Sequence, residues 1–359
     1  MTLQIAALTS GVNVPSSRFR IRQYIQPLRE AGVQVQEFVP RVSKYGLFGY
    51  NPQGLYRWLT MPLYVGWQCV KLGSRTPGLL GSWRNQVTWL EREILPGIFS
   101  LEGLLKKPLV LDVDDAIWLT FPFSPGLIRK IAQQATIVVV GNVFLADWFS
   151  KYARDVRVVP TAVDTDRFSP ENNPDQKDRF VVGWSGGSWN LPYLYDIEIP
   201  LAHFLSRHPE ARLMVVCDQY PKFKKLSPEQ INFIPWSSET EVKAIKSLNV
   251  GLMPLPVTDW ARGKCSFKML QYMACGVPVV VSPVGMNESV LRMGDVGFAA
   301  RTAQEWSSAI EVFYLDREYA SQCGLNGRRV VKANFSRNQI AAQLAGIFRT
   351  FVVDPGGLS

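Results

Sequence analysis

The sequence predicts an α/β protein of two domains that share a cleft, each built on one doubly wound sheet of parallel strands. Three observations carry this prediction. The chain has 359 residues, and domains usually hold about 100–200. Its two halves repeat the order apolar strand, loop, helix, strand, which is typical of parallel sheets. Between them, residues 160–174 are polar and rich in proline, as an exposed connection between domains would be.

Short apolar runs mark the expected strands. In the first half they are 3–8, 33–39, 109–113, 136–140 and 156–159, and in the second half 180–184, 212–217, 231–234, 250–253 and 277–281. The expected domains are therefore 1–165 and 166–335. Residues 336–359 begin with a helical pattern whose apolar face needs a partner surface, which we expect on the first domain.

Composition excludes several classes of protein. Hydrophobic residues make up 47% and charged residues 19% of the chain, which is not the composition of a disordered protein. The net charge of +9 favours an anionic partner. Five scattered cysteines without a CxxC pair fit a reducing cytosol, and two histidines leave little from which to build a metal site or a catalytic triad. We therefore expect a cytoplasmic protein.

The stretch 46–83 alternates aromatic and basic residues, and no run in the chain reaches the ~18–20 apolar residues of a membrane span. Such a mixture suits an interface with anionic lipid. It equally suits an irregular, well-packed flank of the first domain. Both interpretations remain open on the sequence.

The loops that follow the strands are expected to carry the site, because ligands of open α/β sheets bind there. After the first strand, Gly11 allows close approach of the backbone, and Ser16 or Ser17 is expected to cap a helix that Gly32 ends. The arginines at alternate positions from Arg18 to Arg22 cannot share one face. We expect Arg18 to turn toward the cleft. The loop is not a GxGxxG, so a nicotinamide dinucleotide is not favoured.

A second loop places three carboxylates, Asp112, Asp114 and Asp115, at the end of a strand. Two alternatives follow. The acids could hold a metal ion, since hard cations prefer carboxylate oxygens, or Asp114 or Asp115 could bind a substrate hydroxyl without a metal.

Two long stretches are specific. Residues 137–168 read IVVVGNVFLADWF and then VRVVPTAVDTDRF, and residues 251–288 contain GLMPL and MLQYMACGVPVVVSPVGMNE. Both resemble the family-4 retaining glycosyltransferases of the GT-B fold. The resemblance implies two Rossmann-like domains facing across a cleft, with a nucleotide-diphosphate sugar bound mainly by the second domain and an acceptor by the first. It also implies transfer with retention, no bound metal and no further cofactor.

The sequence departs from the family at its donor site. The two glutamates that bracket the family's donor helix fall on Gly263 and Gln271 here, and Gly187 replaces the family's diphosphate-binding arginine. We therefore expect Arg262 and Lys264, just before the helix at Ser266, to neutralise the phosphates.

The remaining donor residues follow from the same resemblance. Gly186, Gly187 and Ser188 would approach the phosphates, Ile234 and Trp236 would hold the nucleobase, and Glu288 would lie near the sugar. The complete expectation is Asp114, Asp115 and Lys264 as catalytic residues, with Gly11, Arg18, Gly186, Gly187, Ser188, Ile234, Trp236, Arg262, Lys264, Gln271 and Glu288 binding the donor.

Two functions remain open on the sequence. The first is a glycosyltransferase of polysaccharide biosynthesis, acting on a glycan or lipid-linked acceptor, without nucleic acid and with an anionic membrane as a possible partner. The second, motivated by the missing glutamates, is a non-catalytic subunit that binds a nucleotide sugar or glycan. A nucleotide-sugar epimerase of the same fold is disfavoured by the match to the donor helix.

Overall fold

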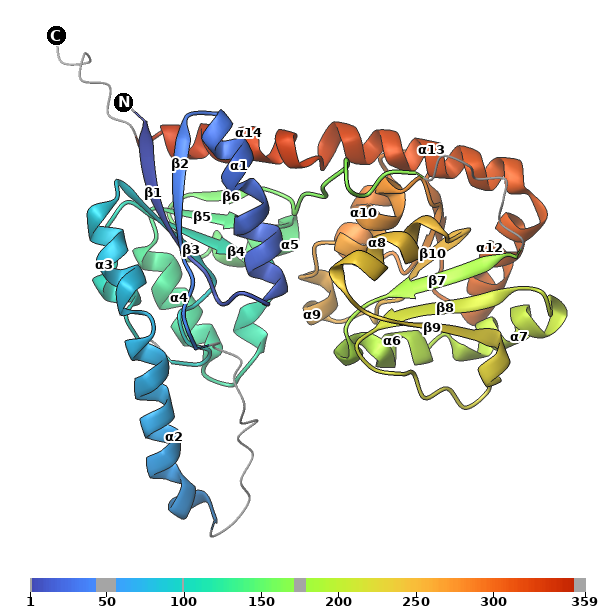
Figure 1. The fold of residues 1–359 in the computed structure, drawn as a ribbon, viewed down its shortest axis with the longest axis horizontal. Coiled ribbons are helices and arrows are strands. Elements are labelled where there is room, and N and C mark those ends of the chain that lie inside the picture. Colours follow the sequence, from blue (N-terminus) through green and yellow to red (C-terminus); the bar gives the residue numbers. More distant parts are fainter. Residues whose placement is uncertain (1, 43–55, 99, 171–178, 352–359) are drawn as a thin grey trace. The chain divides into compact units, whose positions relative to one another are not determined.

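The computed structural model describes residues 2–42, 56–98, 100–170 and 179–351 (Figure 1). It forms two compact units. Unit 1 comprises residues 1–161 and 338–359, and unit 2 comprises residues 162–337. The division falls inside the polar stretch that the sequence marks as the connection, of which residues 171–178 lie outside the described part.

Unit 1 contains a six-stranded parallel sheet in the order β2-β1-β3-β4-β5-β6. The strands are β1 (Leu3–Leu8), β2 (Val33–Phe38), β3 (Val87–Glu91), β4 (Leu109–Val113), β5 (Ile137–Val140) and β6 (Val156–Val158). Its helices are α1 (Ile25–Glu30), α2 (Tyr56–Gly73), α3 (Thr76–Arg84), α4 (Ser124–Gln134), α5 (Val143–Phe149) and α14 (Arg337–Arg349). The inner strands β3, β4 and β5 are buried throughout, as strands covered by helices on both faces must be.

Unit 2 contains a second six-stranded parallel sheet, in the order β12-β11-β10-β7-β8-β9. Counted within the unit, this is the order of dinucleotide-binding α/β folds, 3-2-1-4-5-6. The strands are β7 (Val181–Ser185), β8 (Arg212–Cys217), β9 (Ile231–Pro235), β10 (Val250–Met253), β11 (Val279–Val281) and β12 (Gly297–Ala299).

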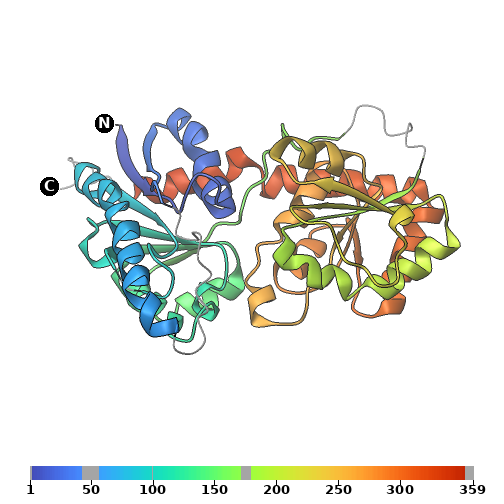
Figure 2. The same cartoon turned by 60° about the horizontal axis from the view of Figure 1, so that its bottom comes forward.

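Helices cover both faces of this sheet (Figure 2). α6 and α7 lie on one face and α8 and α10 on the other (Figure 1). The helices of unit 2 are α6 (Leu191–Tyr195), α7 (Glu198–Arg207), α8 (Ser238–Lys246), α9 (Asp259–Arg262), α10 (Phe267–Ala274), α11 (Met286–Leu291), α12 (Ala303–Leu315) and α13 (Arg317–Asn334). One buried apolar cluster, which includes Trp184, Phe204 and Phe313, joins the sheet to α7 and α12.

Short helical turns complete the two units. They are η1 (Ser17–Ile21), η2 (Arg22–Tyr24), η3 (Glu102–Leu104), η4 (Ile117–Leu119), η6 (Ser188–Asn190) and η7 (Pro228–Gln230).

The predicted class is confirmed: both units are α/β with parallel sheets. Two strands were not expected, β3 and β12. β3 is central, since it pairs with β1 on one side and β4 on the other. Its sequence, VTWLE, has the β-branched and aromatic residues of a strand, but it lies at the edge of the region where the family resemblance is weakest.

The segment after β1 also differs from expectation. It begins with the π-helical turn η1, and neither Ser16 nor Ser17 caps it; both hydroxyls donate to Glu91 instead. Gly32 does end the segment as expected, with φ +79° and its N–H bonded to Arg29 O at 3.0 Å.

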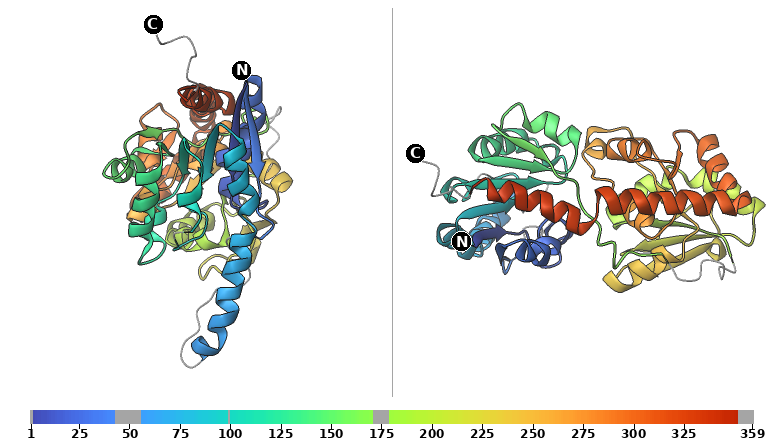
Figure 3. Two further views of the ribbon diagram at one scale, coloured as in Figure 1. Left: turned by 90° about the vertical axis from the view of Figure 1, so that its left-hand side faces the viewer. Right: turned by 90° about the horizontal axis from the view of Figure 1, so that it is seen from above.

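The aromatic and basic stretch forms two helices from Tyr56 onward, so an irregular flank is the wrong description of its described part, while residues 46–55 lie outside that part. α2 extends away from the sheet of unit 1 (Figures 1 and 3). α3 packs tightly on the sheet, because a Cβ at Gly81 would lie 2.1 Å from the ring of Phe38.

The last helix, α14, packs on unit 1. Its buried face holds Ile340, Leu344 and Phe348, and the ring of Phe348 meets Trp89 of β3 edge-on at 5.0 Å. Arg349 donates to Ala31 O at the end of α1. Figure 3 shows α14 beside the elements of unit 1 in both views.

Candidate functional site

Each unit carries candidate site loops of its own at the carboxyl ends of its strands. In unit 2 the strand order reverses between β7 and β10, and such a reversal opens a crevice where α/β folds bind ligands. The loops at this point are 185–188 after β7 and 254–258 after β10.

The loop after β7 is held from behind by α10. Ser185 N donates to the hydroxyl of Tyr272 at 2.8 Å. Burial raises the pKa of Tyr272 well above its usual value, so this phenol stays protonated. The ring of Tyr272 fits only because Gly251 faces it, since a Cβ there would lie 2.4 Å away. Strand β10 and helix α10 therefore position the loop together.

The two glycines of this loop, Gly186 and Gly187, have different roles. At Gly186 a Cβ would lie 2.4 Å from the ring of Trp184, so packing alone requires glycine there. Gly187 is exposed, and its nearest neighbour would be Asp218 Oδ1 at 4.0 Å, so its backbone remains accessible. Gly187 is the glycine that leaves room for a ligand.

Ser188 already binds a partner. Its N–H and its hydroxyl donate to the two oxygens of Asp218 at 2.7 and 2.8 Å. Desolvation opposes ionisation of Asp218, but these bonds, together with hydrogen bonds from Asp218 N and Cys217, outweigh it and lower the pKa of the carboxyl. A phosphate at Ser188 would have to compete with Asp218 for both donors.

The basic loop lies directly before α10, as the sequence indicates. Arg262 binds Asp259 at 3.2 Å within α9, and Lys264 Nζ lies 5.7 Å from the ring centre of Trp260. The side chain of Ser266 does not cap α10; it donates to Asn287 Oδ1 at 2.7 Å. Because α9 ends at Arg262 and α10 begins at Phe267, the basic residues and the N-terminus of α10 belong to one short segment.

The loop after β11 touches this segment. A Cβ at Gly285, which has φ +58°, would lie 2.7 Å from Arg262 O, so the two backbones are in contact. Glu288 follows one turn later and pairs with Arg292 at 2.7 Å on the surface of α11. The structure therefore brings Arg262 and the segment of Glu288 together within unit 2.

Gln271 lies on α10 and is completely buried. Its Oε1 accepts from Lys268 at 3.0 Å, and Lys268 also binds Glu241 of α8 at 2.5 Å. Within the described chain its Nε2 makes no hydrogen bond. A buried donor in this state can accommodate an acceptor atom of a ligand.

The expected nucleobase residues lie farther along the sheet. Ile234 is on β9, an edge strand. Trp236 follows this strand and is 45% exposed, and its backbone N–H donates to Cys217 O at 2.9 Å. A cavity of about 310 Å³ lies at the ends of β10 and β11, lined in part by Tyr193, Val257 and Ser282. None of the expected donor residues lines it.

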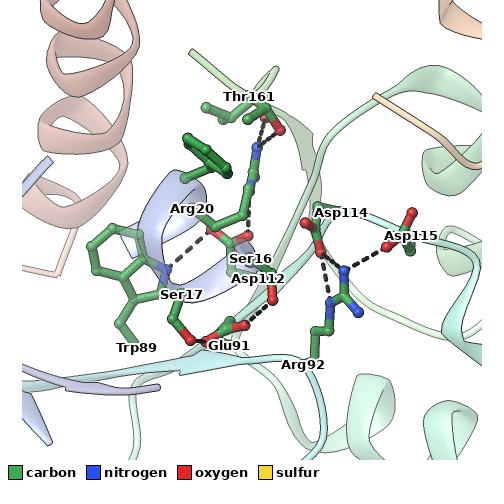
Figure 4. A network of polar contacts seen from close by, with 12 residues as sticks. Ser16, Ser17, Arg20, Trp89, Glu91, Arg92, Asp112, Asp114, Asp115 and Thr161 are labelled. Atoms are coloured by element: carbon green, nitrogen blue, oxygen red, sulfur yellow. Dashed lines mark hydrogen bonds and ion pairs between the residues drawn. The ribbon is translucent and has the colours of Figure 1, made fainter. Parts of the chain in front are cut away.

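In unit 1 the carboxyl ends of β1, β3 and β4 meet in a network of buried charges (Figure 4). Arg20 is the arginine of the three that turns inward: its Nε donates to Asp112 Oδ1 at 2.7 Å and its Nη1 to Thr161 at 3.2 Å. Arg22 instead binds Glu37, and Arg18 lies over the ring of Phe19 at 5.0 Å.

Glu91 orders the loop after β1. Its carboxylate accepts from Ser10 N at 2.9 Å and from the hydroxyls of Ser16 and Ser17. The backbone of Gly11 next to this loop accepts from Arg22 Nη2 at 3.4 Å. A buried carboxylate with three donors is satisfied and holds the loop in one conformation.

Arg92 connects the remaining acids. Its Nη2 lies 2.6 Å from Asp114 and 2.6 Å from Asp115 (Figure 4). Its backbone has φ +54°, a left-handed conformation that costs a side-chain-bearing residue about 1–2 kcal/mol. Such strain is often retained at functional sites. Sequence reasoning missed Glu91 and Arg92, and recognising the strand VTWLE would have found both.

These acids do not form a metal-ion cluster. Among the residues that the structure describes, no three His, Cys, Asp or Glu side chains are arranged to hold a metal ion. Asp112, Asp114 and Asp115 each pair with an arginine instead. In that same part of the chain, no helix has the length and apolarity needed to cross a membrane.

Residues 190–316 match the family model of the glycosyl transferases group 1. The resemblance that the sequence suggests is confirmed at that level for this part of unit 2, while the narrower family 4 stays a prediction. A comparison with curated protein sequences finds no match.

Solved structures share the whole fold. HepE from Anabaena in complex with UDP-glucose superposes with a TM-score of 0.70 at 13% identity over 97% of this chain and 100% of that chain. Sucrose-phosphate synthase from Thermosynechococcus elongatus gives 0.68 at 15% identity, covering 97% and 98%. A glycosyltransferase from Rickettsia africae gives 0.64 at 11%, covering 98% and 99%. The two-domain α/β fold of GT-B type is thereby confirmed.

Proposed function

Starting from the group 1 glycosyltransferase match of unit 2, we propose that this protein moves a sugar from a nucleotide-diphosphate sugar to a glycan or lipid-linked acceptor, with retention and without a bound metal ion. The observation that carries the proposal is one continuous segment of unit 2. It runs from the basic residues Arg262 and Lys264 into the N-terminus of α10, inside the stretch that matches the family.

The chemistry of the leaving group supports this role for the segment. Departure of a nucleoside diphosphate builds negative charge on its phosphate oxygens. Fixed cations and helix N–H groups stabilise such charge without reorganising. Arg262, Lys264 and the first N–H groups of α10 supply both. The exposed backbone of Gly187 at the crevice between β7 and β10 admits the phosphates.

On the acceptor side we assign Asp114 and Asp115 of unit 1. Carboxylates accept the proton of an attacking hydroxyl or orient it. Arg92 holds both side chains in place and offsets part of their negative charge, which supports chemistry that needs no metal cation at these acids.

A donor panel tests the proposal. The purified protein is incubated with UDP-, GDP- and ADP-sugars and candidate acceptors, and release of the nucleoside diphosphate is measured. We expect turnover with one nucleotide series, and we expect a chelator to leave it intact. NMR of the product should show the anomeric configuration of the donor. No release with any donor would refute transfer, and loss of activity with the chelator would refute metal independence.

A non-catalytic binding subunit is the second candidate. It is favoured by Gln271, whose buried amide replaces the family's glutamate and already binds Lys268. Calorimetry that shows tight binding of a nucleotide sugar, together with no turnover on any acceptor, would favour this function over transfer.

The same proposal includes an anionic membrane surface as a partner in the cytoplasm, where a lipid-linked acceptor of polysaccharide biosynthesis would be presented. α2 and α3 support it, because Val65, Val70, Leu80 and Trp83 are exposed apolar residues and the neighbouring Arg84 is an exposed cation. Co-sedimentation with anionic vesicles should fade as salt rises. A protein that ignores such vesicles at low salt has no such surface.

A further inference from the structure

Unit 1 contains a cavity that none of the site residues expected from the sequence lines. It has a volume of about 310 Å³ and lies at the carboxyl ends of β1, β2 and β3, closed on one side by α3. The strand order of the sheet reverses between β1 and β3, so the cavity occupies the position where an α/β sheet offers a ligand site. Neither Asp114 nor Asp115 lines it.

Its polar lining combines acceptors and donors of hydrogen bonds. Glu91 and Glu93 are buried carboxylates, 1% and 7% exposed, and Arg75 is a buried guanidinium that donates to Thr9 O at 3.0 Å. Ser10 is 2% exposed, and its Oγ has no hydrogen-bond partner in the described part of the chain. A buried hydroxyl without a partner costs about 1–3 kcal/mol, which a ligand that bonds to it recovers.

Apolar side chains form the rest of the wall. Leu8, Phe38, Leu90 and Ile94 line the cavity beside these polar groups. A pyranose ring has the matching character, because its hydroxyls both donate and accept around the rim while its C–H groups form apolar faces.

The charges disfavour an anion. Three carboxylates, Glu37, Glu91 and Glu93, line the cavity against one guanidinium, Arg75. Arg22 neutralises Glu37 at 2.6 Å from outside the lining. Lys71 does not line the cavity, and burial and the charge of Arg75 lower its pKa. A phosphate or carboxylate in the cavity would face at least two buried carboxylates at close range.

We propose that this cavity binds an uncharged sugar ring. Its volume is at the small end of ligand sites, ~300–1,000 Å³, and fits a group of that size rather than a long chain. Binding of the ring does not depend on turnover. The identification of that ring as the sugar of the acceptor rests on the proposed function. If the ring is the acceptor sugar, the anionic part of a lipid-linked acceptor lies outside the cavity.

The test uses the full chain and small probes. Saturation-transfer NMR and titration are carried out with the methyl glycosides of glucose, galactose, mannose and N-acetylglucosamine, and with glucuronate and glucose 6-phosphate as anionic counterparts. We expect at least one neutral glycoside to bind and both anions to bind more weakly. Failure of all neutral probes, or tighter binding of an anion, would overturn the proposal.

Two variants locate the binding. Ser10→Ala and Glu93→Gln should each weaken it about 3- to 10-fold, whereas Ser150→Ala and Glu30→Gln, at exposed positions of unit 1, should leave it unchanged. If Ser10→Ala does not fold, Glu93→Gln decides. Unchanged binding in both cavity variants would place the sugar elsewhere. Binding of a nucleotide sugar is measured in parallel. If the nucleotide sugar binds and no glycoside does, this inference alone is refuted. If no nucleotide sugar binds, the proposed function is refuted instead.

Discussion

Arg20 donates from Nε to Oδ1 of Asp112 at 2.7 Å, and both side chains are 1% exposed. Trp89 Nε1 donates to the other carboxylate oxygen at 3.2 Å, and Arg20 also donates to Val159 O at 2.8 Å. The pair therefore ties η1 to β3, to β4 and to the segment after β6. It lies in the same network as Arg92 and the half-buried acids Asp114 and Asp115 (Figure 4).

Breaking this pair from one side should destabilise unit 1 strongly. We expect Arg20→Met to lower the free energy of unfolding by about 3–5 kcal/mol, because it leaves the buried carboxylate of Asp112 without its counter-charge. Urea denaturation measures the change. The double variant Arg20→Met/Asp112→Leu should recover most of the loss, since no charge is then buried. A double variant as unstable as the single one would contradict this account.

The carboxyl of Asp112 should titrate far above an ordinary aspartate. Burial raises its pKa to about 6, although Arg20 opposes the shift. Selective ¹³C labelling of aspartate should show one carboxyl with a midpoint near pH 6 that is missing in Asp112→Asn. Because the native pKa exceeds the ordinary value of 3.8, the contribution of Asp112 to stability is complete below about pH 4 and declines as pH rises through 6. A midpoint below 4 would refute the effect of burial.

Arg92 should matter for turnover more than for folding. We expect Arg92→Gly to lower kcat at least ~10-fold, because Asp114 and Asp115 lose the group that positions them, while glycine accepts φ +54° without strain. Donor affinity should not change. Arg157→Ala, which removes a surface pair with Asp155, is the matched control. Normal turnover in the Arg92 variant would make its ion pairs purely structural.

Lys264 should contribute directly to donor affinity. We expect Lys264→Ala to weaken binding of the nucleotide sugar by ~1.5–3 kcal/mol, the usual range for hydrogen bonds to charged groups. Isothermal calorimetry measures it, and Lys243→Ala, an exposed lysine of α8, serves as control. Equal affinities of the two variants would remove Lys264 from the site.

Restoring the family's glutamate at Gln271 should be harmful here. We expect Gln271→Glu to lower the free energy of unfolding by about 1–3 kcal/mol, because the new carboxylate would be buried beside Glu241 with one lysine, Lys268, between them. Gln271→Met, which keeps the volume and adds no charge, should cost less. Thermal unfolding compares the two. A Glu variant as stable as the wild type would show that the site tolerates a second carboxylate.

Local patterns were sufficient for most of the fold. Strands such as Ile137–Val140 and the end of α1 at Gly32 follow from apolar runs and a glycine with positive φ. The match of residues 190–316 bears out the motif around Gln271. β3 was not expected from the sequence, because a five-residue strand without a flanking motif resembles a buried loop. Glu91 and Arg92, at the end of this strand, were missed for the same reason.

By itself, the sequence determined the two parallel sheets and the resemblance of residues 190–316 to the glycosyl transferases group 1, because strand patterns and loop motifs are local. Only the tertiary structure decided three further features. These are the arginine that turns inward, the glycine that packing requires, and the serines that donate to a buried carboxylate. Arg20, and not Arg18, turns inward because it pairs with Asp112, a residue 92 positions away in the chain. Such choices depend on the burial of charges contributed by distant segments, and no spacing within one segment reveals them.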